Sequence, residues 1–452
     1  MSNRTPLCRE LALWIGLAAP LIGLVVLPTG CSSENPPPSA DKPLAPAEND
    51  SAYDIGGIRD WALIGNDLTP GHDSFELRVR ATTGTDYIDV WLDEQPGVRL
   101  EGGSNNIFGL DIDVSALPPG QHRILLAADG SDEAFAAVDF QRSHPLYVVV
   151  TTDWDDADNT QLSLDLQQEL HDLHPELLLT HFVGPYTFTD PTITPERVDE
   201  LVAWTVNMRD TYGDEIGLHI HPYCNFVDTT SVTCLFEPST VWASDTTGYT
   251  VMVSAYTEQE FTTLLLAADA LFEQHGLGKP TSFRAGGWTA DITTMRALAA
   301  AGYVADTSAN NWARMEEWEG VQNGVLYEWN KSNWASIGDT SQPYYPSELD
   351  AQVPAIGGPM VPVLQVPDNG ILVDYVTADE MIEIFDANWS GGALEVPTAY
   401  SIGYHPSNFS ELYKTRISDA LTHADRFLAS ADAGPVVYTT LSDTVRVWTK
   451  PE

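Results

Sequence analysis

The chain has 452 residues, of which 65 are acidic and 21 are basic, so its formal net charge at pH 7 is -44. A surface this negative repels phosphate backbones and anionic lipid headgroups. The charge therefore argues against binding to nucleic acid and against docking on a membrane through a polybasic surface. Apolar residues make up 43% of the chain and charged residues 19%. This composition is typical of a globular protein, and the length favours two domains with appendages.

The first 30 residues resemble a bacterial lipoprotein signal. Arg4 and Arg9 precede the mostly apolar run LALWIGLAAPLIGLVVL, which ends in PTGC. A basic start followed by such a run is typical of a removable export signal, with an uncleaved anchor as the alternative. The resemblance implies cleavage before Cys31 and lipidation of that cysteine. We therefore expect an exported lipoprotein of the outer membrane or cell surface, attached through lipid alone.

Two further segments precede the larger part of the chain. Residues 31–53 are rich in proline and poor in large apolar side chains, which predicts an extended, solvated tether. Between residues 54 and 144, alternating runs such as FELRVR and YIDVWL are separated by turn clusters such as LPPGQH. This pattern predicts a small antiparallel β-sandwich. The stretch ALPPGQHRILLAADGSDEAFAAVDF resembles bacterial immunoglobulin-like domains, and we see no candidate catalytic residue in it.

From residue 145 to the end, strand-like runs alternate with amphipathic helices. LYVVVTTD, EIGLHIHPY, TSFRAGG and TAYSIGYHP have the pattern of strands, and PERVDELVAWTVNMRD and TEQEFTTLLLAADALFEQHG that of helices. Gly276 and Gly302 stand where helix C-caps are expected. Repeated β/α units predict a parallel (β/α) barrel over residues 145–452. In such barrels the functional residues gather at the carboxyl ends of the strands.

Four carboxylates follow the first of these strands in VVVTTDWDDADN: Asp153, Asp155, Asp156 and Asp158. The run lacks the spacing and the glycine of a calcium loop. A helix N-cap explains Asp158 alone. A metal ion or a general base accounts for the others, because a cation offsets the repulsion and divides the carboxylates into ligands and base.

Later strand ends carry groups that suit the same site. GLHIHPY places His219 and His221 on one face of a strand, as two imidazoles that bind one ion require. SFRAGGW provides Arg284, a permanent cation that can keep a carboxylate ionised. GYHPSNF provides His405, which is suited to proton donation.

Three other histidines in this region are weaker candidates. His171 and His174 have the spacing of metal ligands on a helix, but that helix has a solvated pattern, so we expect both at the surface. His181 ends the second strand, and whether it approaches the site stays open.

These segments, in this order, resemble the five motifs of the polysaccharide deacetylase family, the family 4 carbohydrate esterases that share the NodB-homology domain. The resemblance covers about two thirds of the chain and implies a distorted (β/α) barrel. TTDWDD resembles the first motif, with Asp153 as the base and Asp156 as a metal ligand, and Asp155 as the rival for that second role. GLHIHPY resembles the histidine motif, with His219 and His221 as ligands. It departs from the family in its spacing, because the usual two histidines are four residues apart.

The remaining motifs imply further roles. SFRAGGW resembles the third motif, in which Arg284 pairs with the base and Trp288 walls the groove. VADTSA resembles the fourth motif, in which Asp306 orients the acid, and SIGYHPSN the fifth, with His405 as that acid. Tyr223, which stands where the family has its second histidine, is expected to contact the substrate.

The reaction implied by the resemblance is hydrolytic removal of N-acetyl groups from an extracellular or cell-wall polysaccharide. A divalent ion, expected to be zinc, polarises the acetyl carbonyl and activates a water, and Asp153 takes the proton of that water. His405 then protonates the departing amine. Two alternatives stay open: an O-acetyl esterase or other amide hydrolase on the same barrel, and a catalytically decayed surface lipoprotein that binds glycans.

Two cysteines remain once Cys8 leaves with the signal and Cys31 carries lipid. They are Cys224 and Cys234, near the histidine pair. In an exported chain the pair is expected to form a disulfide. A pair of metal thiolates is the alternative, although the gap is longer than in the usual zinc site.

Overall fold

A computed structural model of the chain describes residues 41–82, 84–103, 105–320 and 324–450. The predicted signal and the predicted lipidation site Cys31 lie outside these residues. The chain separates into two compact units, of which the first combines residues up to Gly57 with Ser74–Ala116 and Ile124–Ala137, and the second contains the rest. Among the helices of the described part, none has the length and apolar character that a membrane span requires.

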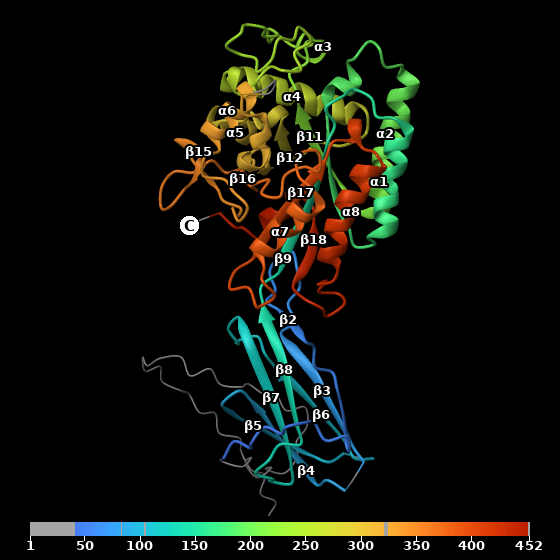
Figure 1. Ribbon diagram of the computed structural model, residues 1–452, viewed down its shortest axis with the longest axis vertical. Coiled ribbons are helices and arrows are strands. Elements are labelled where there is room, and N and C mark those ends of the chain that lie inside the picture. Colours follow the sequence, from blue (N-terminus) through green and yellow to red (C-terminus); the bar gives the residue numbers. More distant parts are fainter. Residues whose placement is uncertain (1–40, 83, 104, 321–323, 451–452) are drawn as a thin grey trace, which may run out of the picture. The chain divides into compact units, whose positions relative to one another are not determined.

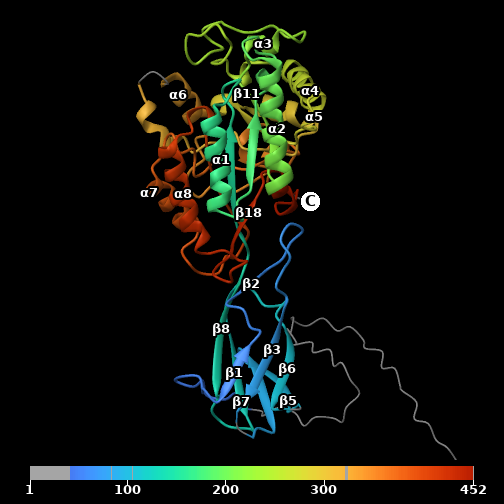
Figure 2. The same cartoon turned by 90° about the vertical axis from the view of Figure 1, so that its right-hand side faces the viewer.

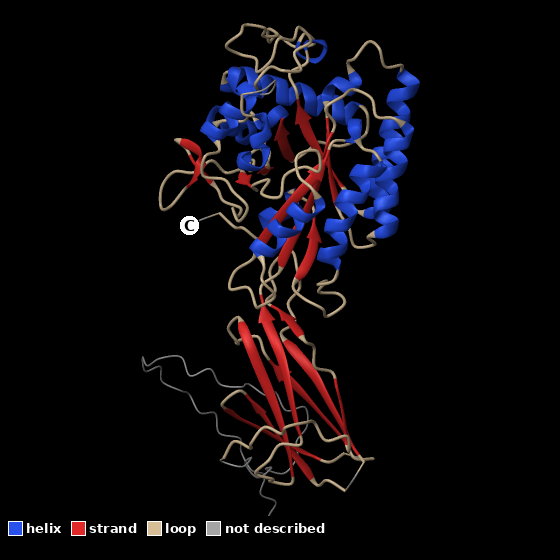
Figure 3. Ribbon diagram, in the orientation of Figure 1, coloured by secondary structure: helices blue, strands red, loops and turns tan. Residues whose placement is uncertain are grey.

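The first unit is built from antiparallel strands. β1 (Tyr53–Gly56), β3 (Ser74–Ala81) and β6 (Ile107–Asp113) form one sheet, and β4 (Tyr87–Leu92) pairs with both β5 (Gln95–Glu101) and β7 (Gly120–Ala128). Every second side chain of β3 is buried, so one face of its sheet packs on a core and the other meets solvent. Figure 3 shows strands and loops in the described part of this unit. The antiparallel pairing agrees with the predicted sandwich, whereas the immunoglobulin-like resemblance stays a prediction.

Part of the segment expected to be a free tether belongs to this unit. The backbone N–H of Leu44 donates to Asp132 O at 2.9 Å, and Ala134 N–H donates to Leu44 O at 2.8 Å. Asp50 N–H donates to Phe135 O at 2.8 Å. These backbone bonds extend the first unit toward the N-terminus beyond the predicted boundary.

The second unit is a curved parallel sheet enclosed by helices (Figure 1). Its strands are β9 (Leu146–Asp153), β10 (Leu179–Val183), β11 (Glu215–Ile220), β12 (Ser282–Ala285), β13 (Ala305–Asp306), β16 (Leu364–Gln365), β17 (Thr398–Tyr404) and β18 (Val436–Thr439). The hydrogen-bonded order is β16-β13-β12-β11-β10-β9-β17, and β18 also pairs with β9. All of these pairings are parallel. The predicted distorted (β/α) barrel is confirmed.

Helices connect successive strands and cover the outside of the sheet, as α1 and α2 do in Figure 2. They are α1 (Gln161–Leu173), α2 (Pro195–Tyr212), α3 (Cys224–Val227), α4 (Glu258–Gln274), α5 (Ile292–Ala301), α6 (Gly324–Asn333), α7 (Ala378–Asn388) and α8 (Glu411–Asp425). Gly302 ends α5 with φ of 89°, as predicted, and Gly276 follows the C-cap of α4. β2 (Trp61–Leu63) pairs in parallel with β8 (Ala136–Ser143), and both belong to the five-stranded sheet of order β2-β8-β7-β4-β5. β14 (Pro346–Ser347) and β15 (Asp350–Pro354) form a separate antiparallel pair.

Strand β9 lies between β10 and β17, one strand from the β17 end of the hydrogen-bonded order. All eight of its side chains are buried, which explains its continuous β-branched run. It pairs with β17 along most of its length, with β18 over Leu146–Val149 and with β10 over Val150–Asp153. The last residue of this buried strand is Asp153, so the aspartate run emerges at the carboxyl edge of the sheet.

Candidate active site

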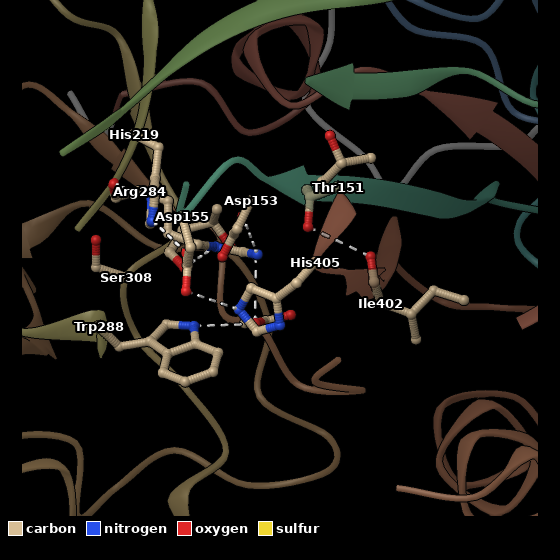
Figure 4. Close-up of polar contacts among 12 residues, drawn as sticks. Thr151, Asp153, Asp155, His219, Arg284, Trp288, Ser308, Ile402 and His405 are labelled. Atoms are coloured by element: carbon tan, nitrogen blue, oxygen red, sulfur yellow. Dashed lines mark hydrogen bonds and ion pairs between the residues drawn. The ribbon is translucent and has the colours of Figure 1, made fainter. Parts of the chain in front are cut away.

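The candidate residues meet at the carboxyl ends of the parallel strands. Asp153 ends β9, His219 and Arg284 are paired in register on β11 and β12, and His405 directly follows β17. Figure 4 shows these side chains and Asp155 pointing toward one another. Because such strand ends share one edge of the sheet, residues distant in sequence converge there.

One carboxylate and two imidazoles form a possible metal site, which we call the acceptor triad: Asp155, His219 and His221. One ligand atom of each lies within 4.8 Å of the others, and no other such group is found among the residues that the structure describes. Asp155 Oδ1 is 3.1 Å from His219 Nε2 and 3.3 Å from His221 Nε2. The spacing HxH therefore brings both histidines to one point.

Backbone carbonyls determine which nitrogen of each ring carries the proton. His219 Nδ1 lies 2.9 Å from Arg284 O, and His221 Nδ1 lies 2.8 Å from Tyr249 O. A carbonyl oxygen can only accept, so Nδ1 donates in both rings and Nε2 of each neutral ring presents a lone pair. Two lone pairs and a carboxylate oxygen thus face one point, which a divalent cation stabilises. Two imidazoles and one carboxylate are a donor set that fits zinc with open positions.

The prediction that Asp156 rather than Asp155 is a metal ligand is wrong. In the turn after β9 the side chain of Trp154 is buried, Asp155 faces the histidines, and Asp156 is exposed. Asp156 bonds to Ser407 instead, and burial and the neighbouring Asp155 raise the pKa of its carboxyl group. Asp155 therefore occupies the position that was expected for Asp156 as a metal ligand.

Arg284 lies between two buried carboxylates. Its Nη1 donates to Asp153 Oδ1 at 3.0 Å, as the resemblance implies, and its Nη2 lies 3.3 Å from Asp368 Oδ2. Arg284 thus places a positive charge against the carboxylate of Asp153. Asp368 was not singled out in the sequence, and it also accepts from Trp288 Nε1 at 3.1 Å. Burial raises the pKa of Asp368 to about 6.

Asp374 holds His405, so the prediction that Asp306 orients this histidine is wrong. His405 Nδ1 is 2.9 Å from Asp374 Oδ2, and its Nε2 lies 3.7 Å from Asp155 Oδ2. Burial would lower the pKa of His405, but the carboxylates of Asp155 and Asp374 raise it to about 10. Asp306 instead accepts from Ser308 N–H at 3.0 Å and from Ser308 Oγ at 2.7 Å, and burial raises its pKa to about 6.

A strand-like register explains how Asp374 reaches His405. Leu372 forms a parallel bridge with Gly403, so two residues further along each segment Asp374 and His405 lie side by side. Arg416 on α8 donates to the carbonyl of Val376 at 2.9 Å and to that of Val373, which holds this segment in place. The available sequence signal is a carboxylate directly after the apolar run ILV, a run too short to predict a strand.

These groups line a pocket of about 230 Å³ with aromatic and apolar walls. Its lining comprises Asp153, Asp155, His219, His221, Trp242, Tyr249, Gly287, Trp288, Leu326, Tyr375 and His405. Trp288 lies in the wall, as the resemblance implies. Tyr223 is not in the described lining, and its hydroxyl donates to Asp155 O at 3.2 Å.

The backbone of Trp288 is in the left-handed region, with φ of 56°, directly after Gly287 with φ of 58°. A bulky residue rarely adopts this conformation, and such strain clusters at functional sites. The side chain of Trp288 donates to Asp368, and its carbonyl accepts from Trp334 Nε1 at 2.9 Å. These bonds hold the indole against the pocket.

The loop that follows the histidine pair contains the two cysteines. Cys224 and Cys234 are joined by a disulfide, with Cα atoms 5.3 Å apart. They are therefore not metal thiolates in this structure.

The weaker histidine candidates lie outside the pocket lining. His171 and His174 are buried, with 4% and 3% exposure, so the surface prediction is wrong. His174 bonds to Asp425 and Ser418. His181 is buried, and it bonds to Thr152 and to Asp214.

Comparison with known proteins gives a distant likeness. No model of a known family matches the chain, and no curated protein matches it. A protein provisionally classed as a polysaccharide deacetylase from Mycobacterium smegmatis is 15% identical, with a TM-score of 0.39 and coverage of 68% of this chain and 95% of that chain. The family 4 carbohydrate esterase from Streptomyces lividans, solved with acetate, is 10% identical, with a TM-score of 0.34 and coverage of 69% and 100%.

A 4-alpha-glucanotransferase from Thermococcus litoralis also matches, at 8% identity, with a TM-score of 0.36 and coverage of 67% of this chain and 40% of that chain. The matched structures thus include different classes of carbohydrate enzyme. At these identities and TM-scores the likeness carries no conclusion about the reaction.

Proposed function

We propose that the protein is a metal-dependent hydrolase that removes N-acetyl groups from an extracellular or cell-wall polysaccharide. One observation carries the proposal: the acceptor triad shares a pocket with Asp153, which Arg284 contacts, and with His405, which Asp374 contacts. This arrangement supplies a cation site, a base and an acid around a single small cavity. The motif resemblance described above points to the same reaction.

Asp155, His219 and His221 would hold the ion, zinc or a similar divalent metal. When bound, such an ion polarises a carbonyl oxygen and lowers the pKa of a water. The protein positions the substrate against this site with its aromatic walls, since a sugar ring presents an apolar face that packs on Trp288 or Tyr375.

Asp153 is the proton acceptor of the proposal. It lines the same pocket as the acceptor triad, and Arg284 Nη1 donates to its Oδ1 at 3.0 Å. A carboxylate beside the site of attack can take a proton from the attacking water.

His405 is the proton donor. Asp374 accepts from Nδ1, so Nε2 is directed toward the pocket, and the carboxylate of Asp374 is among the charges that raise the pKa of the ring. An amine is a poor leaving group until it gains a proton, whereas an alcohol leaves more readily. A protonated histidine therefore favours an N-acetyl substrate over an O-acetyl ester.

The test is acetate release from a panel of N-acetylated and O-acetylated glycans. The proposal expects release from an N-acetylated polymer, loss after treatment with a chelator, and recovery on addition of Zn²⁺. If acetate is released faster from the O-acetylated polymers, the protein is an O-acetyl esterase and not an N-deacetylase. Protein that binds no divalent ion and releases no acetate would be the decayed, glycan-binding alternative.

We also propose an exported lipoprotein anchored through Cys31, with a signal at 1–30, a tether that ends before Leu44, an immunoglobulin-like domain from there to residue 144 and the barrel at 145–452. The support is the sequence pattern of the N-terminus and a disulfide of the kind that forms in oxidising compartments. Mass spectrometry of the mature protein should find an N-terminal, lipid-modified cysteine. A mature chain that retains residues before Cys31 would contradict this proposal.

A further inference from the structure

Tyr249 contacts two members of the acceptor triad in three ways. Its hydroxyl donates to Asp155 Oδ2 at 2.9 Å. Its ring stacks on His221, with centroids 4.3 Å apart and planes inclined by 17°. Its backbone carbonyl accepts from His221 Nδ1 at 2.8 Å. A single residue thus orients both a carboxylate and an imidazole.

The fold gives Tyr249 little freedom to move. It follows Gly248, whose φ is 94° and where a Cβ would lie 2.3 Å from Pro222 O and 2.8 Å from Cys224 N. Cys224 N–H donates to Thr247 O at 2.7 Å. The disulfide from Cys224 ties the same stretch to the following loop. The chain before Tyr249 is therefore packed directly against the chain after His221.

We propose that Tyr249 is a positioning residue that makes Asp155 bind a metal ion through one oxygen. The hydroxyl of Tyr249 donates a hydrogen bond to Oδ2 of Asp155, so Oδ1 is the oxygen that faces the two histidines. Without this bond, Oδ2 is free to join Oδ1 on the ion or to turn toward His405 Nε2, now 3.7 Å away. This inference rests on the proposed function, because it assumes that the triad binds an ion.

The physical reason is coordination number. A carboxylate can bind a metal through one oxygen or two. In a catalytic zinc site, three protein ligands leave a position for water or substrate, and a second carboxylate oxygen competes for it. Hydrogen-bond partners that orient the ligands also raise affinity, and their loss typically costs about 10- to 100-fold.

The variant that tests this role is Tyr249→Phe, which keeps the ring and the carbonyl and removes the hydroxyl. Metal-free protein is titrated with Zn²⁺ against a chromophoric chelator, which requires no substrate. The dissociation constant should rise by about 10- to 100-fold relative to the unmodified protein. The visible absorption of the Co²⁺-loaded protein should change as well, because it reports coordination number and geometry.

Tyr303→Phe is the matched control. Its hydroxyl donates to the carboxylate of Asp269 at 2.7 Å, it is buried in the same unit, and neither residue lines the pocket. This variant loses a similar tyrosine–aspartate bond, so its zinc affinity and Co²⁺ spectrum should be unchanged. Thermal unfolding in chelator compares the folding of both variants.

The outcomes are distinct. Weaker zinc binding in Tyr249→Phe alone supports the role of the hydroxyl, and if that variant is unstable without metal, the spectrum of its Co²⁺-loaded form decides. Equal affinity and an unchanged spectrum, or equal loss in both variants, overturn the role of Tyr249 and leave the proposed function intact. If the unmodified protein binds no ion, the metal site of the proposed function fails, and this inference fails with it.

Discussion

Two clusters in the second unit each combine one aspartate with two histidines. One is the acceptor triad at the carboxyl edge of the sheet. The other joins His171 on α1, His181 on β10 and Asp214 just before β11. In this second cluster Nε2 of both histidines lies 3.0 Å from Asp214 Oδ2. Among the described residues only the first cluster has the geometry of a metal site.

The difference lies in the ring protons. A carboxylate accepts, so His171 and His181 each donate Nε2–H to Asp214, whose other oxygen accepts from Leu179 N–H at 2.9 Å. Nδ1 of His181 faces the hydroxyl of Thr152 at 3.1 Å, and a hydroxyl can donate to it. Burial would raise the pKa of Asp214, but the bonds from the two histidines lower it. This cluster is satisfied without an ion.

In the acceptor triad, main-chain carbonyls take the Nδ1 protons, so the Nε2 lone pairs face a carboxylate oxygen. The two clusters therefore have the same composition and opposite hydrogen-bonding polarity. The group that faces Nδ1 therefore differs between the clusters: a hydroxyl faces that of His181, and main-chain carbonyls face those of His219 and His221.

The most severe test of this contrast replaces each aspartate in turn. Asp155→Asn should lower metal affinity by about 100-fold or more, because an amide replaces a charged ligand. Asp214→Asn should keep the metal and reduce the free energy of unfolding by about 3 kcal/mol, because two buried N–H groups lose a charged acceptor. Metal analysis and denaturant unfolding measure the two effects. Metal loss in Asp214→Asn with none in Asp155→Asn would reverse the assignment.

The second test separates binding the ion from chemistry within the pocket. Asp153→Asn should leave the metal bound and lower turnover by about 10²- to 10⁴-fold, because a proton acceptor is removed and no ligand is lost. Acetate release and metal content are measured on the same preparation. A preparation that has lost its metal would place Asp153 among the ligands.

A third test compares Asp374, which contacts His405, with Asp306, to which the motif resemblance assigned that role. Asp374→Asn should slow deacetylation about 10-fold or more, with a smaller effect on an acetyl ester, because the acid is held less firmly. Asp306→Asn should not show this difference between amide and ester, since Asp306 bonds to Ser308. Rates on matched amide and ester substrates decide between them. An amide-selective loss in Asp306→Asn would restore the original prediction.

The smallest expected effect concerns the last aspartate of the opening run. The sequence suggested Asp158 as a helix cap, but Thr160 is the N-cap of α1 and accepts from Ser163 N–H, whereas Asp158 forms an exposed ion pair with Arg197. Thr160→Ala should reduce the free energy of unfolding by about 1 kcal/mol. Asp158→Ala should reduce it by no more than about 0.5 kcal/mol. Both effects are measured by denaturant unfolding. A larger loss of stability in Asp158→Ala than in Thr160→Ala would refute the assignment of Thr160 as the cap.

The sequence by itself determined the architecture of the second unit and the edge that carries the site. Buried strands read as continuous apolar runs and helices as amphipathic ones, and these are local patterns that survive in a single sequence. The carboxyl ends of such strands carry Asp153, His219, Arg284 and His405. Their convergence follows from the parallel fold, without knowledge of any side-chain contact.

Tertiary structure alone decided which neighbours complete each group. Asp155 rather than Asp156 faces the histidines because the turn after β9 buries Trp154. Asp374 reaches His405 through a bridge between segments 31 residues apart, and Tyr249 reaches Asp155 across 94 residues. Hydrogen-bond partners of this kind depend on how distant segments pack. A local pattern shows that a polar side chain is present, and only packing shows whether it meets a carbonyl, a carboxylate or solvent.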